Sequence, residues 1–362
     1  MWNPFAPRHT VTDISLDHVP VMQQTEDAFT TLPHVVAAAL RLYGHPRSVD
    51  EVALHTGDCF AIDLSTDTPG LGLTAAGELL TQGLQDLGLL ARLTAHEAEA
   101  GQYTRLFTVV RAGLRNYRPT LACGGWPSPG STDRRGYFWG IVHRFDLDTA
   151  DFVGSTVRDP FLDRLLATDL VWPLQPEAVR GAYLIENWQE PPLKPGKLTR
   201  RALTRGVSLL AGDAGIGGLA SYARLLRVLA QEELTPDSPL ASRYPFPMMV
   251  AVRTQFEQIA RNLDSASGVV PRRLRATMST CRSLAHDAAK LLLDSEPPRV
   301  HGRRARGAIR AGKWPWAEDA WRKRVEELAE PDGDARQAEI ARIETLRDLH
   351  GRLTEALDLL VS

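Results

Sequence analysis

The chain has 362 residues, of which 43% are hydrophobic and 24% are charged, and its formal net charge at pH 7 is −2. These values are ordinary for a globular protein and exclude wholesale disorder, while the near-neutral charge provides no global attraction to nucleic acid or to an anionic membrane. The length exceeds the roughly 100–200 residues typical of one domain, so we expect two domains.

The cysteines and the N-terminal residues bear on the cellular compartment. Cys59, Cys123 and Cys281 are odd in number, far apart and without a C-x-x-C pair, which predicts reduced thiols rather than a disulfide framework or a zinc site. The first residues lack the basic and apolar regions of a signal peptide, and no stretch approaches about 18 consecutive apolar residues. We expect a cytoplasmic protein without a membrane span, metal or cofactor.

The beginning of the chain is predicted to be helical. A helix over residues 33–43 has proline in its first turn and ends before Gly44, a residue typical of helix C-termini. Ser48 is expected to cap a second helix that stops at Gly57. Residues 74–87 carry apolar side chains at helical spacing and predict a third helix.

Short runs rich in aromatic and β-branched residues follow and predict one antiparallel sheet. They cover residues 106–110, 119–123, 137–145 and 152–157. Residues 148–151 suit a hairpin turn between the last two runs, because Asp tolerates turn geometry. The proline-rich segment 188–197 cannot be regular helix or central strand, so we place the domain boundary there, with domains 1–190 and 191–362.

The second half is predicted to be all helical. Candidate helices cover residues 198–211, 217–233, 248–263, 271–293, 316–330 and 335–360. The last one carries an apolar stripe of Ile340, Ile343, Leu346, Leu349, Leu353, Leu357 and Leu360. Packing against neighbouring helices is the simpler interpretation of this stripe, and a homodimer interface through the C-terminal helix is the alternative.

A basic segment interrupts these helices. Residues 299–313 contain six Lys or Arg side chains, among them Arg303, Arg304 and Arg306, and Trp314 and Trp316 follow closely. Such a segment could bind RNA, an acidic carrier protein or a phosphorylated ligand. A solvated interhelical loop is the simpler interpretation, and the overall charge does not favour nucleic acid as a partner.

Several motifs in the first half occur in an order known from one enzyme family. Residues 18–24, the helix end at 40–44 and the helix start at 48–52 resemble the beginning of bacteriocin-processing, double-glycine-leader cysteine peptidases. Residues 118–121, 136–142 and 157–160 resemble later elements of the same family. The resemblance covers residues 17–165 and implies an α+β, papain-like fold in which N-terminal helices pack on an antiparallel sheet.

The helical half carries a second resemblance. The glycines at 215–218, which lead into residues 222–226, resemble the helical domain that follows this fold in relatives of butirosin-biosynthesis protein H. Those relatives are similar to acyltransferases that take an acyl group from a carrier-protein thioester. The resemblance implies a peptide or an acyl or peptidyl carrier protein as partner.

The papain-like family places four groups in its site. They are a cysteine at the start of a buried helix, a histidine base, a carboxylate that orients the histidine, and a glutamine that binds the oxyanion. The resemblance assigns the glutamine to Gln24 and the carboxylate to Asp159. Counting the family's usual thirteen residues back from Gly44 reaches Thr31 where the cysteine is expected, and no cysteine lies within reach of that helix start.

The position of the histidine has two readings. Aligning the Gly-His motif places it at Tyr137, whereas His143 precedes Asp159 by a family-like interval of sixteen residues. Both residues would face the same side of a regular strand. We prefer Tyr137, because the apolar strand that should follow the histidine follows Tyr137.

The hydroxyl of Thr31 is a poor substitute for a thiol, because its oxygen attacks only when a neighbouring base takes its proton. The simpler interpretation is that Thr30 or Thr31 caps the helix. A triad of Thr31, His143 and Asp159 is the alternative. Cys59, which lies between apolar residues after the second helix, is predicted to be a core residue.

These observations predict a catalytically impaired papain-like domain, a pseudoenzyme that binds a peptide or a carrier-bound acyl or peptidyl chain in a bacterial natural-product or processing pathway. One alternative is an active acyltransferase or amide-forming enzyme that uses His143 or Tyr137 with Asp159 and needs no cysteine, since an amine can attack a thioester directly once both are positioned. A third hypothesis is an interaction protein that acts through the basic segment and the C-terminal helices.

Overall fold

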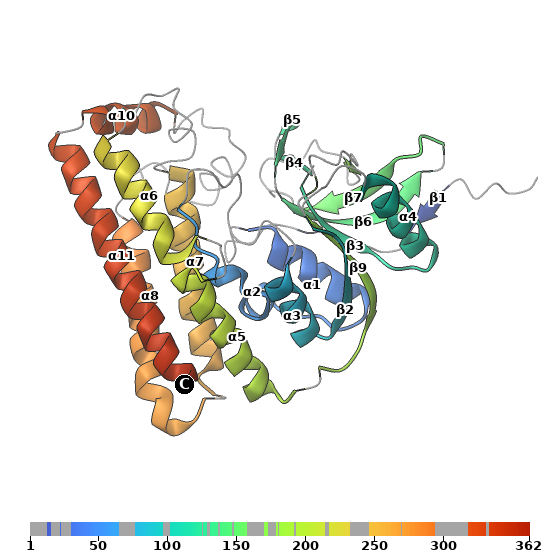
Figure 1. Cartoon of the computed structure of the whole chain (residues 1–362), viewed down its shortest axis with the longest axis horizontal. Coiled ribbons are helices and arrows are strands. Elements are labelled where there is room, and N and C mark those ends of the chain that lie inside the picture. The colour runs from blue at the N-terminus through green and yellow to red at the C-terminus, as the bar shows by residue number, and fades with distance from the viewer. Residues whose placement is uncertain are drawn as a thin grey trace, which may run out of the picture.

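A computed structural model gives the arrangement of the chain (Figure 1). It describes residues 13–15, 22, 30–64, 77–96, 102–124, 126–128, 131–136, 138–146, 148–157, 170–172, 179, 181–191, 193–213, 217–231, 246–268, 270–293, 318–330 and 333–362. A sheet lies at one side, a group of long helices lies at the other, and short helices lie between them. The protein is therefore of the α+β class. No helix in the described ranges is both long and apolar enough to cross a membrane.

The N-terminal helices confirm the sequence prediction. They are α1 (Leu32–Leu42), α2 (Val49–Thr56) and α3 (Glu78–Asp86), with a short 3-10 helix η1 (Asp58–Phe60) after α2. Ser48 caps α2, because its hydroxyl accepts a hydrogen bond of 3.1 Å from the Glu51 N–H. Gly57 ends α2 with φ of 84°, a left-handed conformation that glycine adopts without strain. Residues 74–76 of the third predicted helix lie outside the described residues.

The main sheet has seven strands, and every neighbouring pair is antiparallel. Its strand order is β2 (Leu89–His96), β9 (Gly181–Trp188), β3 (Thr120–Cys123), β6 (Trp139–Asp146), β7 (Phe152–Thr156) and β8 (Leu170–Trp172), and β1 (Asp13–Ser15) also pairs with β6. A separate two-stranded ribbon consists of β4 (Trp126–Ser128) and β5 (Ser131–Gly136). The strands predicted over 119–123, 137–145 and 152–157 thus correspond to β3, β6 and β7.

The prediction of a strand over residues 106–110 was wrong. These residues belong to helix α4 (Gln102–Arg115). Leu106, Val110 and Leu114 are at most 4% exposed and follow one another at intervals of four residues, so they form one buried helical face. The β-branched pair at 109–110 resembles a strand locally, but the longer period of four decides the conformation. Strands β2 and β9 were not predicted.

The predicted hairpin turn joins β6 to β7. Phe145 lies opposite Phe152 at the end of the ladder, and the carboxylate of Asp146 accepts hydrogen bonds from the N–H groups of Asp148 and Thr149 at 2.9 and 3.1 Å. This side-chain-to-backbone pattern stabilises the turn by mimicking a backbone turn. The hairpin is thereby confirmed, and it fixes which residues of the two strands face each other.

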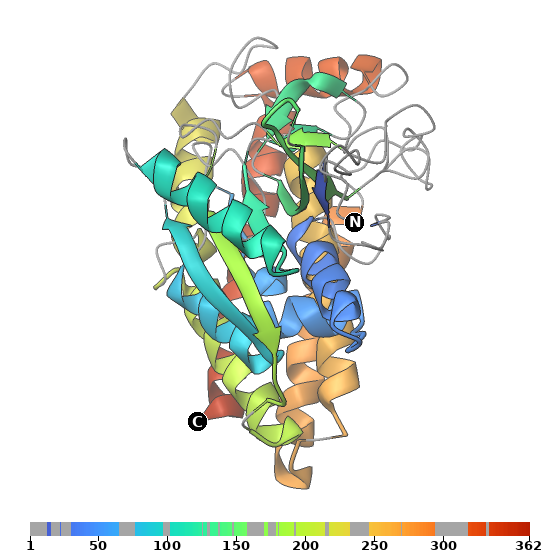
Figure 2. The same cartoon turned by 90° about the vertical axis from the view of Figure 1, so that its right-hand side faces the viewer.

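The two faces of the sheet bury different elements (Figures 1 and 2). Leu121, Trp139 and Ile141 belong to the larger core, which includes α1. Ala122 and Val142 belong to a smaller core beneath α4. This alternation follows from the two-residue period of a strand, and it leaves α1 as the helix that covers the inner face.

The helices of the second half also confirm the prediction. They are α5 (Pro195–Ala211), α6 (Gly218–Gln231), α7 (Phe246–Ala266), α8 (Arg275–Leu293), α10 (Glu318–Ala329) and α11 (Asp334–Val361), with a 3-10 turn η3 (Arg272–Leu274) before α8. The apolar stripe of α11 packs against α5, α6 and α8. The stripe therefore packs within the chain. A homodimer through α11 stays a prediction, and it would have to use a face of α11 other than this stripe.

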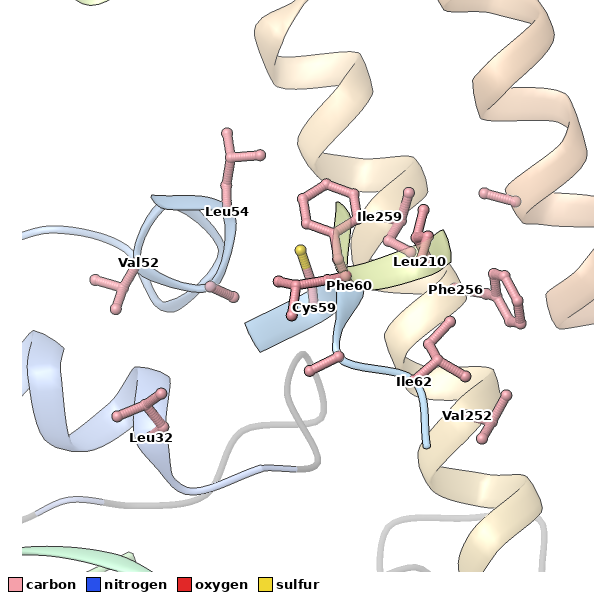
Figure 3. Close-up of a cluster of buried hydrophobic side chains, with 14 of the residues drawn as sticks. Leu32, Val52, Leu54, Cys59, Phe60, Ile62, Leu210, Val252, Phe256 and Ile259 are labelled. Atoms are coloured by element: carbon pink, nitrogen blue, oxygen red, sulfur yellow. The ribbon is translucent and has the colours of Figure 1, made fainter. Parts of the chain in front are cut away.

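The two halves share one continuous core. Phe60 and Ile62, which follow α2, lie among Leu210 of α5 and Phe256 and Ile259 of α7 (Figure 3). The Gln255 amide of α7 also donates a hydrogen bond of 2.9 Å to the Ala61 carbonyl. The segment 188–197 marks the change from sheet to helices, but the buried residues run across that boundary.

Candidate functional site

The start of α1 is where the motif resemblance places the nucleophile. Thr31 occupies the N-cap position and is 7% exposed. Its hydroxyl oxygen accepts a hydrogen bond of 2.7 Å from the backbone N–H of Trp139 on β6. The neighbouring Thr30 hydroxyl donates to the buried carboxylate of Asp58. Neither side chain caps α1, so the capping prediction was wrong; both hydroxyls instead link the helix start to other parts of the fold.

The backbone of Trp139 is held on both sides. Its N–H donates to Thr31, and its carbonyl accepts a hydrogen bond of 2.6 Å from the Thr156 hydroxyl on β7. The first residue of β6 is therefore the part of the sheet that contacts the start of α1. The assignment of Tyr137, two positions earlier in the sequence, as the counterpart of the family's histidine stays a prediction. Tyr137 itself lies outside the described residues.

His143 lies farther along the same strand. Four residues separate it from Trp139, a span of about 13 Å. Its Nε2 atom is 2.9 Å from the Ser155 hydroxyl of β7, and the residue is 7% exposed. The described hydrogen bonds thus join Thr31 to Trp139 and His143 to Ser155, and they do not bring Thr31 and His143 together.

The remaining predicted site residues cannot be placed. Gln24 and Asp159 lie outside the described residues, as do Arg303, Arg304 and Arg306 of the basic segment. The role of Asp159 as the carboxylate of a triad with Thr31 and His143 therefore stays a prediction. Among the described residues, no cluster of three His, Cys, Asp or Glu side chains is arranged to hold a metal ion.

Ser155 is a residue that the sequence analysis missed. It lies opposite Ile141 in the β6–β7 ladder, so its side chain is on the face of the sheet that packs on α1. A regular hairpin with its turn at residues 148–151 would pair position 143 with position 156 and would leave Ser155 on the other face of the sheet. The observed ladder has an irregularity between Val142 and Arg144, so the contact between His143 and Ser155 could not have been inferred from the predicted turn.

The cysteines occupy the core. Cys59 is fully buried in η1, and burial together with the nearby Asp58 carboxylate raises the pKa of its thiol well above the ordinary value. This confirms the core assignment. Cys123 is also fully buried, and it lies directly opposite Trp139 in the β3–β6 ladder. A cysteine thus does lie close to the start of α1 in space, which the spacing along the sequence did not reveal.

A polar cavity of about 330 Å³ lies where α2, α3, α5 and α7 meet. Its lining includes His55, which is 8% exposed and whose pKa is lowered to about 4, chiefly by burial and then by the charge of Arg205. The Arg205 guanidinium donates to the His55 carbonyl at 2.7 Å and pairs with the Asp86 carboxylate at 2.6 Å. The other charged side chains of the lining are also paired within the protein, Arg47 with Glu51 and Asp50 with Arg261.

No protein-family model matches this chain, and a comparison with curated proteins yields no significant match. The papain-like interpretation therefore depends on the motifs within residues 17–165 and on the arrangement of α1 against the sheet.

Proposed function

We propose that this protein is a papain-like pseudoenzyme, which binds a peptide or a carrier-bound acyl or peptidyl chain without cleaving it. The observation that carries the proposal is the hydrogen bond of 2.7 Å from the Trp139 N–H to the Thr31 hydroxyl oxygen. Thr31 stands where the motifs expect a thiolate, and the order of helices and antiparallel strands agrees with the papain-like arrangement. All three cysteines are buried and none forms a disulfide bond among the described residues, which supports a cytoplasmic setting.

The chemistry of this position argues against nucleophilic attack. An attacking oxygen needs an accessible lone pair and a base that takes its proton. Thr31 is 7% exposed and its hydroxyl oxygen already accepts a backbone N–H, while the imidazole of His143 contacts another hydroxyl. Thr31 is therefore assigned a structural role, in which it fixes the first residue of β6 against α1.

Substitution of Thr31 tests this role. Thr31→Val leaves the Trp139 N–H buried without an acceptor and should lower the free energy of unfolding by about 1–3 kcal/mol. Thr31→Ser keeps the oxygen and should retain most of the stability. Urea unfolding measures both variants, and equal stability of the valine and serine variants would contradict the assignment.

Binding is tested with a fluorescently labelled double-glycine leader peptide and with acyl-loaded carrier protein. We expect saturable binding by anisotropy and no cleavage or acyl loss by mass spectrometry. Gln24→Ala and Tyr137→Ala should weaken binding, whereas Lys290→Gln, at an exposed position of α8, should not. Unchanged affinity in the first two variants would count against a cleft at this position.

The contact between Ser155 and His143 supports a second candidate, an acyltransferase without a cysteine. A serine hydroxyl 2.9 Å from an imidazole nitrogen has the geometry of a nucleophile and its base. Ser155 would pass its proton to Nε2 and form an ester bond with the acyl carbon as the carbon–sulfur bond of a thioester breaks. The imidazolium would return the proton to the leaving thiolate, and an amine would then take the acyl group from the serine.

The two candidates differ in one measurement. Incubation with an acyl thioester should add the acyl mass to wild-type protein if Ser155 is a nucleophile, and Ser155→Ala and His143→Gln should each abolish the adduct. Wild-type protein that binds the thioester without forming an adduct or turning it over supports the pseudoenzyme.

A further inference from the structure

A second cavity lies away from the α1 site, in the helical half. Its volume is about 720 Å³, which is within the range of small-molecule sites. The start of α5, the segment before α8 and the end of α11 surround it, and these three ends lie close together in Figures 1 and 2. Its lining combines apolar side chains with basic ones.

The inner wall of the cavity is apolar. Leu203, Leu360 and Val361 belong to the buried core, and Val270 and Leu274 are partly buried residues packed against it. These side chains supply a continuous apolar surface that an acyl or similar chain can cover. Removing such surface from water favours binding in proportion to the area covered.

The rim of the cavity is basic. Lys194, Lys197, Arg200 and Arg273 line it, and no Asp or Glu side chain is among the lining residues. Arg200 is already engaged, because it donates to the carbonyl oxygens of Val361 and Ser362 at 2.9 and 3.1 Å. The side chains of Lys194, Lys197 and Arg273 form no ion pair within the part of the chain that the structure describes. Three cations therefore remain for a ligand.

The first turn of α5 adds a second electrostatic feature. Helix N-termini carry partial positive charge and free N–H groups, and carboxylates normally occupy their first turn. In α5 the N-cap is Lys194, Lys197 follows, and no acidic residue is present. Gly196, whose N–H is among the groups without an intrahelical partner, lines the cavity. The positive end of a helix repels lysine side chains, and a bound anion offsets this repulsion because both the lysines and the helix end attract it.

We propose that this cavity binds an amphipathic anion, an acyl chain that ends in a phosphate or carboxylate group. The chain covers the apolar wall, and the head group lies between Lys194, Lys197 and Arg273. The proposal does not depend on the assignment of Thr31, because the two sites share no residue. Failure of peptide or carrier binding at the α1 site would leave it standing.

Titration calorimetry with octyl phosphate, below its micelle concentration, tests the proposal on the full chain. We expect saturable one-to-one binding that weakens as salt concentration rises. Affinity should rise roughly fourfold for each methylene added between butyl and octyl phosphate. Octanol and inorganic phosphate should each bind at least tenfold more weakly than octyl phosphate.

Variants at the rim locate the binding. Lys197→Gln and Arg273→Gln should each weaken octyl phosphate binding about tenfold, because each removes a charged hydrogen-bond donor. Lys290→Gln is the matched control and should bind as the wild type does. Equal affinity in all three variants, or octanol binding as tightly as octyl phosphate, would overturn the proposal. Binding to phosphatidylglycerol vesicles without binding of soluble octyl phosphate would also overturn it, and would indicate a membrane surface as the partner.

Discussion

His350 shows how a single buried side chain links stability to pH. Its ring is fully buried in α11, with Nδ1 3.1 Å from the Tyr222 hydroxyl, and burial lowers its pKa to about 4. An unfolded chain restores a pKa near 6.5. The folded state therefore keeps its full stability above pH 6.5 and loses it as the pH falls towards 4, because only the unfolded state takes up the proton there.

We expect the free energy of unfolding to fall by about 2 kcal/mol between pH 7 and pH 4.5 through His350 alone. His350→Gln removes the titrating group, so its stability should depend less on pH over this range. Urea unfolding at the two pH values measures the difference. His286→Gln, at an exposed position of α8, is the control and should keep the wild-type dependence. The same dependence in both variants would contradict the assignment.

Part of the candidate site could be predicted from the sequence and part could not. The family's spacing of thirteen residues back from Gly44 reaches Thr31, and Thr31 does lie at the N-cap of the buried helix α1. The partner of its hydroxyl, the Trp139 N–H, could not be predicted, because it depends on how the helix start meets a strand 108 residues away. Cys123 lies opposite Trp139 because β3 pairs with β6, and this pairing is equally non-local.

Among the secondary-structure elements, local signals predicted the helices better than the strands. Capping by Ser48 and the left-handed Gly57 are decided within a few residues, so α2 was placed correctly. Strands β2 and β9 were missed because their stability comes from pairing with each other, across more than 80 residues of chain. The helix α4 was misread because a short β-branched run was given more weight than the four-residue period.

Two helical glycines separate the effect of helix propensity from that of helix packing. A Cβ atom at Gly351 of α11 would meet nothing within 4 Å, so Gly351→Ala should stabilise the protein by about 1 kcal/mol. A Cβ atom at Gly83 of α3 would lie 2.6 Å from the His55 carbonyl oxygen of α2. Gly83→Ala should therefore destabilise the protein by about 1–3 kcal/mol despite the same gain in propensity.

Thermal unfolding of the two glycine variants measures these opposite changes. A stabilised Gly83→Ala variant would mean that α2 and α3 do not pack closely.

The core that the two halves share predicts that they unfold together. Phe60 follows α2 but packs against α5 of the other half, where a Cβ atom on Gly206 would be 2.8 Å from its ring. Phe60→Ala should cost about 3–5 kcal/mol. Far-ultraviolet circular dichroism reports mainly on the helical half, whereas tryptophan fluorescence reports mainly on the first half, because five of the eight tryptophans precede residue 190. In the Phe60→Ala variant both signals should change at the same urea midpoint, which should be lower than that of the wild type. Two separate transitions, with only one displaced by the substitution, would show that residues 1–190 and 191–362 fold independently.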